Sequence, residues 1–398
     1  MTRHDRFVLG PRARNVAWSL VVAGAAAIAA GLAVDPRRTW PNLLIDGFYT
    51  TAIAVAGVVF IALQFLTGAT WNAGLRRIPE ALMAALPASG VMMLALFFGR
   101  DWLYPAHRAG ADDAAAGAHV IYFGAPLFFG RMALFVAVWV LFARLIRRAS
   151  LQQDRQRDDE GAARQHERLI RYSAMFTVVF AISFSIASFD WLMSVVPRWT
   201  STIFAVYWFA GVLAGGTAAI TLAAVLLNER GYLAGIVDEE RLHDLGKLLL
   251  AFTTFWAYIW LSQYLLIWYG NVPEEAAYYA SRTSDRWIVL FLLNLVLNWV
   301  VPFFVLLPRD AKRSARVLKW IAIVVLAGRW LDLYVTVMPE VIPAPSVRPL
   351  DVVILCGYGA AVFLIAARAL ASAPLVPRFA VAGGEHHAPA AMRSDHRV

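Results

Sequence analysis

The sequence predicts an all-α integral membrane protein with ten transmembrane helices, and two observations carry that prediction. Of the 398 residues, 60% are hydrophobic and 16% are charged, whereas soluble domains average roughly 45–50% and about 25%. The apolar residues also gather in blocks of about 20, the length at which a helix crosses a hydrocarbon core of about 30 Å. Together with a mean hydropathy of +0.60, this excludes a soluble enzyme.

Each block is expected to be a helix, because backbone groups in lipid must be hydrogen-bonded within the segment itself. In chain order the spans are 15–34, 47–67, 78–98, 122–145, 169–190, 202–227, 246–270, 286–307, 317–338 and 350–371. Residues 1–14 form a short amino tail, 15–371 a ten-helix membrane domain, and 372–398 a polar carboxy tail that we expect to be disordered.

The basic residues predict the orientation of these spans. The amino tail, every second connection and the carboxy tail hold 26 of the 36 Lys and Arg residues. Because cytoplasmic loops are enriched in Lys and Arg, both termini are predicted to be cytoplasmic. The net charge of +9 is therefore interpreted as a topology signal and not as nucleic-acid binding. The polar segment 147–171 is either a solvated helix extension or a docking surface for a cytoplasmic partner.

Metal and haem chemistry is not expected in this chain. Its single cysteine, Cys356, cannot by itself hold an iron–sulfur cluster or a thiolate zinc site. Haem iron between membrane helices is held by axial ligands, usually histidine. None of the eight histidines of this chain lies well inside a predicted span. We therefore predict no metal site and no covalently attached or ligated cofactor.

Ionisable residues inside spans are costly in lipid, and each is a candidate functional residue. Asp332 lies in the outer part of the ninth span, and Arg329, three residues earlier, shares its helical face. The two are either an internal ion pair that fixes packing or part of a proton-handling site. Asp190 ends the fifth span, and Arg131 in the fourth is expected either to pair with it structurally or to snorkel outward.

The seventh span carries polar residues along one face. Lys247, Thr254, Tyr258, Ser262 and Tyr269 follow spacings of 7, 4, 4 and 7, which align on one side of a helix. His243 and Asp244 add ionisable groups at its cytoplasmic end, and Asn294 and Asn298 follow at i, i+4 in the eighth span. These groups form either separate interhelical hydrogen bonds or a proton half-channel.

Two further patterns concern packing. Gly211 and Gly215 form a small-xxx-small pattern, which is typical of closely packed membrane helices. Pro87 in the third span and Pro302 in the eighth are expected to kink their helices.

Four stretches of the chain resemble the membrane subunits of bacterial alternative complex III, a quinol:electron-acceptor oxidoreductase whose large membrane subunits belong to the polysulfide-reductase (NrfD-like) family. The stretches are RRIPEALMAALP, SFDWLMSVVPRWTSTIFAVYWFAG, HDLGKLLLAFTTFWAYIWLSQYLLIWYGNVPEE and RWLDLYVTVMPE. The chain looks most like the second large membrane subunit, the F-type. The resemblance covers about 43–371.

The resemblance implies two four-helix bundles, spans 2–5 and 6–9, flanked by spans 1 and 10, in a bacterial cytoplasmic membrane. It also implies iron–sulfur, haem c and other membrane subunits as partners, besides membrane lipid and a quinol or menaquinol pool. The expected function is that of a redox-inactive subunit that supports proton translocation coupled to quinol oxidation. A quinol-binding anchor of the same complex, with Arg131, Asn294 and Asn298 as site candidates, and a secondary transporter are the alternatives.

Overall fold

The computed structural model describes residues 6–104, 122, 124–156, 158–196 and 199–377, and within these ranges the chain is helical without a strand. Ten of the helical segments are long and apolar enough to cross a membrane, which confirms the predicted fold class. Six spans are single helices, namely α1 (Pro11–Val34), α2 (Pro36–Leu66), α7 (Ala125–Gln153), α9 (Phe204–Glu229), α10 (Glu239–Gly270) and α16 (Pro349–Ala371). A seventh, α15 (Ala315–Val337), is extended by the short helix η7 (Met338–Glu340).

The other three spans are divided or extended. The third comprises α3 (Arg77–Met83), α4 (Leu86–Leu94), η2 (Ala95–Gly99) and α5 (Arg100–Leu103), and the fifth is α8 (Asp159–Trp191) with η5 (Met193–Val195). The eighth comprises α12 (Ile288–Leu295), η6 (Val296–Val300) and α13 (Val301–Leu306). Shorter helices lie in the connections: η1 (Ala73–Leu75), α11 (Pro273–Arg282) and α14 (Arg309–Arg313).

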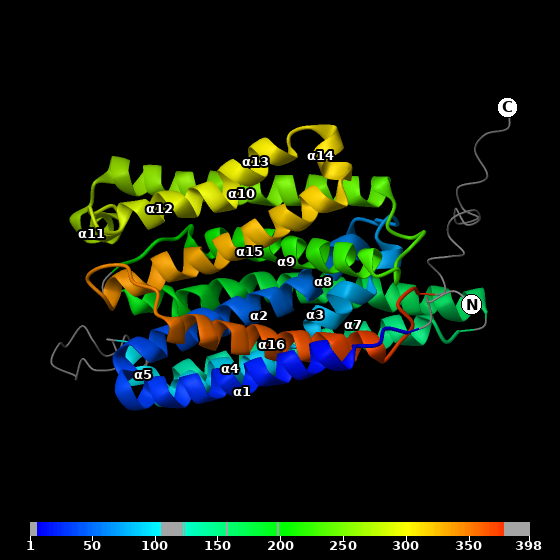
Figure 1. The fold of residues 1–398 in the computed structure, drawn as a ribbon, viewed down its shortest axis with the longest axis horizontal. Coiled ribbons are helices and arrows are strands. Elements are labelled where there is room, and N and C mark those ends of the chain that lie inside the picture. The colour runs from blue at the N-terminus through cyan, green and yellow to red at the C-terminus, as the bar shows by residue number, and fades with distance from the viewer. Residues whose placement is uncertain (1–5, 105–121, 123, 157, 197–198, 378–398) are drawn as a thin grey trace.

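The spans lie side by side along one axis and pack as two groups and a pair (Figure 1). Helices α2, α3, α4, α7 and α8 pack together, and α9, α10, α12, α13 and α15 form the second group. Helices α1 and α16 pack against each other and both contact α2, so the first and last spans flank the same group. Helix α1 begins and α16 ends at the same end of the molecule (Figure 1), as an even number of spans requires.

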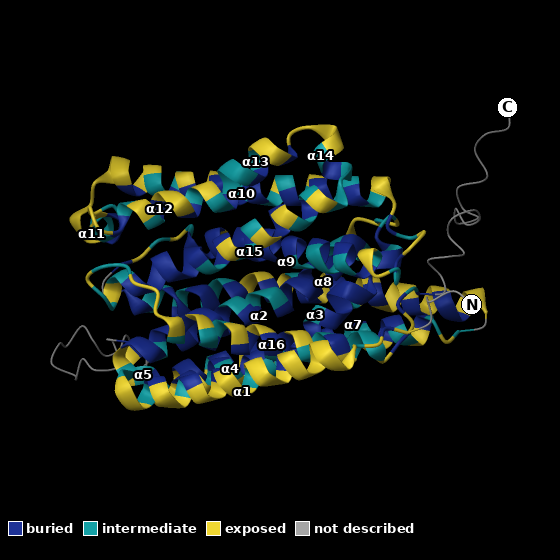
Figure 2. Cartoon of the chain, in the orientation of Figure 1, coloured by how far each residue is buried: buried dark blue, intermediate teal, exposed yellow. Residues whose placement is uncertain are grey.

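The centre of the molecule is formed by α2, α9 and α15, whose surfaces are mostly buried, while α1 and the outer sides of α10, α12 and α13 are exposed (Figure 2). In a bilayer these exposed faces are available to lipid. Helices α2 and α9 form the seam between the two groups, and one cavity described below lies at this seam.

Proline explains where the divided spans break. A proline in a helix removes one hydrogen bond and clashes with the carbonyl four residues earlier. Pro87 lies four residues after Met83, where α3 ends, and Pro302 lies four residues after Asn298, within the π-helical turn η6. Both predicted irregularities are confirmed, and the second orients a residue of the candidate site.

Of three predicted segments, one begins earlier in the structure, one is helical, and one lies mostly outside the described residues. Helix α2 begins at Pro36, eleven residues before the predicted start at 47, so its amino-terminal half carries polar residues into the bundle. Most of the polar segment 147–171 lies in helical extensions, because α7 continues to Gln153 and α8 begins at Asp159. Most of the carboxy tail, 378–398, lies outside the described residues.

Candidate functional site

Asp332 of α15 is the centre of a buried polar cluster in the second helix group. It is 1% exposed. Its Oδ1 accepts hydrogen bonds from the hydroxyl of Tyr207 on α9 and, at 2.6 Å, from Nδ2 of Asn294 on α12. Its Oδ2 lies 3.1 Å from Nη2 of Arg329. The carboxylate is therefore held by three different helices.

Arg329, the partner of Asp332, is also bound by side chains of neighbouring helices. Its Nε donates to Oδ1 of Asn298 at 2.6 Å, and its guanidinium carbon lies 4.3 Å from the ring centre of Trp256 on α10. A Cβ at Gly211 would lie 2.7 Å from Nη1 of Arg329, and one at Gly215 would lie 3.3 Å from its Cγ. The small-xxx-small pattern of α9 therefore makes room for the arginine side chain.

The π-helical turn η6 brings both asparagines of the eighth span to this cluster. The Asn298 amide donates to Oδ1 of Asn294 at 2.6 Å and to its carbonyl at 2.8 Å. Gly328 permits the approach, because a Cβ there would lie 2.9 Å from the Asn298 amide atoms. The predicted pair Arg329–Asp332 is confirmed, and Asn294 and Asn298 link its two ends.

A small cavity of about 20 Å³ adjoins Asp332, enough space for one water molecule. Its walls include Gln263 of α10, which is 2% exposed, and Arg282 of α11. Among the described residues, Oε1 of Gln263 and Oδ2 of Asp332 accept no hydrogen bond. Two buried acceptors therefore lie beside a cavity of the size that a bridging water needs.

Arg282 connects this cavity to the carboxyl-terminal end of α15. It is 1% exposed and donates to the carbonyls of Val335 and Thr336, at 3.1 and 2.5 Å, in the last turn of that helix. A cation at a helix carboxyl terminus is favourable because it satisfies free carbonyls and the helix dipole. Its Nη1 lies 3.3 Å from Oε1 of the partly exposed Glu340.

The second predicted acid, Asp190, pairs with Arg131 across α8 and α7. Nε of Arg131 donates to Oδ2 of Asp190 at 2.8 Å, and the hydroxyl of Tyr122 donates to Oδ1 at 3.1 Å. The guanidinium also lies 3.8 Å from the ring centre of Tyr122. Arg131 is therefore paired, which was one of the two expectations for it, although about a fifth of its side chain remains exposed.

The polar face of the seventh span points away from the cluster. Tyr258 and Tyr269 are 66% and 87% exposed, and Lys247 pairs with Asp244 at 2.6 Å on the outside of α10. Helix α10 instead buries the side that carries Trp256, Trp260 and Gln263. The remaining predicted members of the path, Ser262 and His243, are partly exposed, and the structure does not bring them to Asp332.

Further buried charges, not selected from the sequence, lie near the amino-terminal end of α2. Nη2 of Arg38 and Nδ2 of Asn42 contact the two oxygens of Asp351 on α16 at 2.6 and 2.7 Å. Deeper along α2, Asp46 accepts from the indole of Trp330 at 2.9 Å. The early start of α2 places these residues in the bundle.

Another buried cluster closes the opposite end of the first helix group. Glu80 of α3 is 2% exposed and contacts Arg77 and the hydroxyl of Ser150 on α7. Arg77 also pairs with Asp154 just after α7. The motif RRIPEALMAALP thus anchors α3 to the extended end of α7.

Comparison with known proteins adds no relative: no protein-family model matches the chain, and a search of curated proteins finds no match.

Proposed function

We propose that this chain is a redox-inactive membrane subunit of a quinol:electron-acceptor oxidoreductase of the alternative complex III type, and that it supports proton translocation coupled to quinol oxidation. The observation that carries the proposal is the buried cluster around Asp332, a carboxylate inside a membrane span with charged, hydroxyl and amide partners and a water-sized cavity. Membrane proteins that move protons use carboxylates in such positions.

The geometry suits a carboxylate that gains and loses a proton. Arg329 stabilises the ionised form through its charge, whereas burial in the bundle favours the neutral form. The hydroxyl of Tyr207 both donates and accepts, so it can serve Asp332 in either state. Beyond the cavity, Arg282 and Glu340 offer polar contacts toward the outer end of the bundle.

The proposal includes partners that this chain alone does not contain. Electron transfer belongs to iron–sulfur and haem c subunits, and quinol or menaquinol supplies electrons and protons. The exposed polar residues of α10, above all Tyr258 in the middle of the helix, suit contact with another membrane subunit, because a hydroxyl facing lipid lacks a hydrogen-bond partner. The sequence signal for membership is the resemblance described above, in a bacterial cytoplasmic membrane with both termini cytoplasmic.

Asp332→Asn in the assembled complex tests the proposal, since it keeps the side-chain shape and removes the proton-binding group. Quinol oxidation in detergent should persist, and proton movement into sealed vesicles should be lost. Asp285→Asn, at an exposed carboxylate, is the matched control and should change neither. Because the loss of Asp332 also leaves Arg329 unpaired, Tyr207→Phe provides a milder variant that should slow proton movement without loss of assembly. Undiminished proton movement in both variants would contradict the proposal.

A quinol-binding anchor of the same complex is the second candidate, and the Asp190–Arg131 cluster favours it. A carboxylate and a guanidinium near the outer end of their spans, partly accessible at Arg131, offer an acceptor and a donor for a quinol head group. Arg131→Met should then raise the quinol concentration needed for half-maximal oxidation, with proton movement per electron unchanged.

A further inference from the structure

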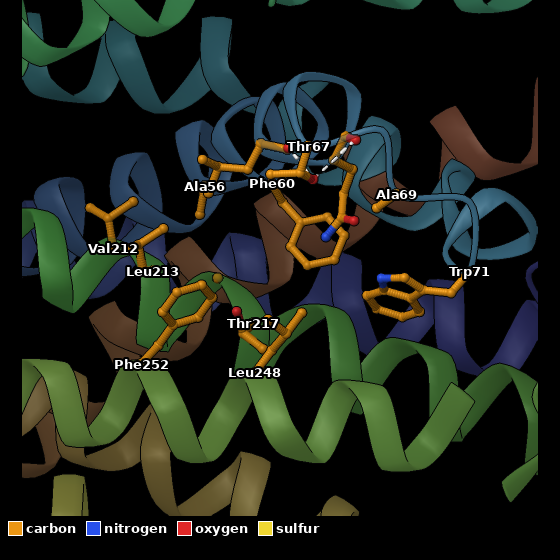
Figure 3. A pocket seen from close by; sticks show the side chains of 13 residues that line it. Ala56, Phe60, Thr67, Ala69, Trp71, Val212, Leu213, Thr217, Leu248 and Phe252 are labelled. Carbon is orange, nitrogen blue, oxygen red and sulfur yellow. Dashed lines mark hydrogen bonds between the residues drawn. The ribbon is translucent and has the colours of Figure 1, made fainter. Parts of the chain in front are cut away.

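A cavity of about 340 Å³ lies at the seam between the two helix groups (Figure 3). Helices α2, α9 and α10 form its walls, together with residues that follow α2. Its lining is mainly aromatic and aliphatic, including Phe60, Leu213, Leu248 and Phe252. None of the residues that line it carries a charge, so it suits an apolar ligand and not an ionic substrate.

The lining residues of the first wall follow α2 from Ala56 to Gln64 and continue beyond the helix to Trp71. Trp71, beyond the end of α2, lies at one end of the labelled side chains, and Ala56 and Val212 lie toward the other (Figure 3). From Ala56 to Leu66, where α2 ends, the helix rises about 15 Å at 1.5 Å per residue. That length equals about half of a hydrocarbon core of about 30 Å, the depth of one leaflet.

Polar side chains contact the cavity at two depths. Gln64 lies in the last turn of α2, is 9% exposed and lines the cavity. Thr67 lies next to it, at the end of the helix. Thr217, near the middle of α9, is 2% exposed and also lines the cavity. The Gln64 amide is a hydrogen-bond donor on an otherwise mostly apolar wall, so it suits a ligand with a hydrogen-bond acceptor at this level.

We propose that this cavity binds one acyl chain of a membrane phospholipid from the leaflet at the end where α2 finishes. The chain lies along Phe60, Leu213 and Phe252, and an ester carbonyl at the base of the chain accepts a hydrogen bond from the Gln64 amide. Three features of the ligand match the site: its length, its apolar surface and the position of its acceptor oxygen at the hydrocarbon boundary. The inference does not depend on the proposed function.

A bound chain would act as a packing element between the helix groups. Helix α2 belongs to one group, and α9 and α10 belong to the other. Because voids without partner atoms forfeit dispersion contacts, filling the cavity stabilises the seam. Removal of the lipid is therefore expected to lower the thermal stability of the purified protein.

A photoreactive lipid tests the inference on the full chain in lipid nanodiscs. Phosphatidylethanolamine with a diazirine at the end of one acyl chain is irradiated, and the labelled peptides are mapped. The expected labels lie on α2 near Ala56 and on α9 near Val212. Leu213→Trp fills the cavity and should remove these labels. Leu266→Trp, a matched change on the exposed face of α10 where Leu266 is 64% exposed, should leave them in place.

Two milder variants keep the test decisive if Leu213→Trp does not fold. Gln64→Leu removes the amide and should weaken labelling, whereas Thr217→Val should leave it unchanged, because a phospholipid has no oxygen at that depth. Absence of labels near Ala56 and Val212 in the wild-type protein would overturn the proposal. So would loss of labelling in Thr217→Val together with displacement by an added prenylquinone, which would identify a ligand with oxygen deep in the cavity.

Discussion

Arg329 donates from Nε to Oδ1 of Asn298 at 2.6 Å, so a side chain of the eighth span binds the guanidinium group of the ninth. Asn298 in turn donates to Asn294, and Asn294 donates to Asp332. The arginine and the aspartate, already paired directly, are thus joined a second time by two amides. Such a closed network fixes the rotation of the eighth span relative to α15, because the side chains of Asn294 and Asn298 must both face the charged pair.

Asn298→Leu is expected to destabilise the protein. Arg329 would lose its only hydrogen-bond acceptor among the described side chains, and a hydrogen bond to a charged group contributes about 1.5–3 kcal/mol. Thermal unfolding in detergent should show a lower midpoint than for the wild type. The conservative change Val289→Leu, at an exposed position of α12, serves as the control. A variant as stable as the control would show that the amide is dispensable.

Pro302→Ala tests whether the π-helical turn is needed to direct Asn298. Removal of a proline from a helix interior normally stabilises the helix, by about 3 kcal/mol. Here we expect a loss of stability instead, because a regular helix would rotate Asn298 away from Arg329. Pro273→Ala at the first turn of α11, where proline is well tolerated, should be nearly neutral. A gain in stability for Pro302→Ala would show that the turn does not depend on the proline.

A double-mutant cycle at Arg329 and Asp332 measures how strongly they are coupled. Arg329→Met leaves a buried carboxylate without its cation, and Asp332→Leu leaves a buried guanidinium without its anion. Each single change should cost about 3–5 kcal/mol. The double variant should be more stable than the sum of the single losses predicts. Additive losses, measured by chemical unfolding, would mean that the two charges do not depend on each other.

The part of the site that could be predicted depends on contacts within one helix. Arg329 and Asp332 are three residues apart, and Asn294 and Asn298 are four apart, so helical periodicity alone places each pair on one face. Tyr207, Gln263 and Arg282 were not selected, because their contacts with the cluster join helices that are far apart in sequence. No local pattern specifies which helix faces which.

The rotation of α10 shows a second limit. In a soluble protein the polar face of a helix points outward, but in a bilayer both the lipid-facing and the buried sides of a helix are apolar. A row of polar residues therefore does not reveal whether it faces inward. Lys247, Tyr258 and Tyr269 face outward in this chain, whereas Gln263, one residue from the partly exposed Ser262, faces the cavity beside Asp332. The ten spans themselves were predictable because their length and hydropathy are set by the membrane.

Cysteine labelling tests the predicted orientation. In a Cys356→Ser background, Glu160→Cys at the exposed start of α8 and Glu274→Cys in the exposed first turn of α11 lie at opposite ends of the helix bundle. A membrane-impermeant thiol reagent added to intact cells should label only Glu274→Cys, and Glu160→Cys should react after the cytoplasmic side is exposed. Labelling of both in intact cells would contradict the predicted topology.

The contact between α1 and α16 offers a comparison of two glycines on one helix. A Cβ at Gly357 would lie 2.8 Å from the Cα of Gly24, whereas a Cβ at Gly359 would meet nothing within 4 Å. The obstructing atom at Gly357 belongs to the backbone of α1, so it cannot move without displacing the whole helix.

Gly357→Ala should therefore separate α1 from α16 and lower the unfolding midpoint. Gly359→Ala should be neutral or stabilising by up to about 1 kcal/mol, because alanine favours helix more than glycine does. Equal effects of the two changes on the unfolding midpoint would show that the close approach of the two backbones does not contribute to the stability of this pair.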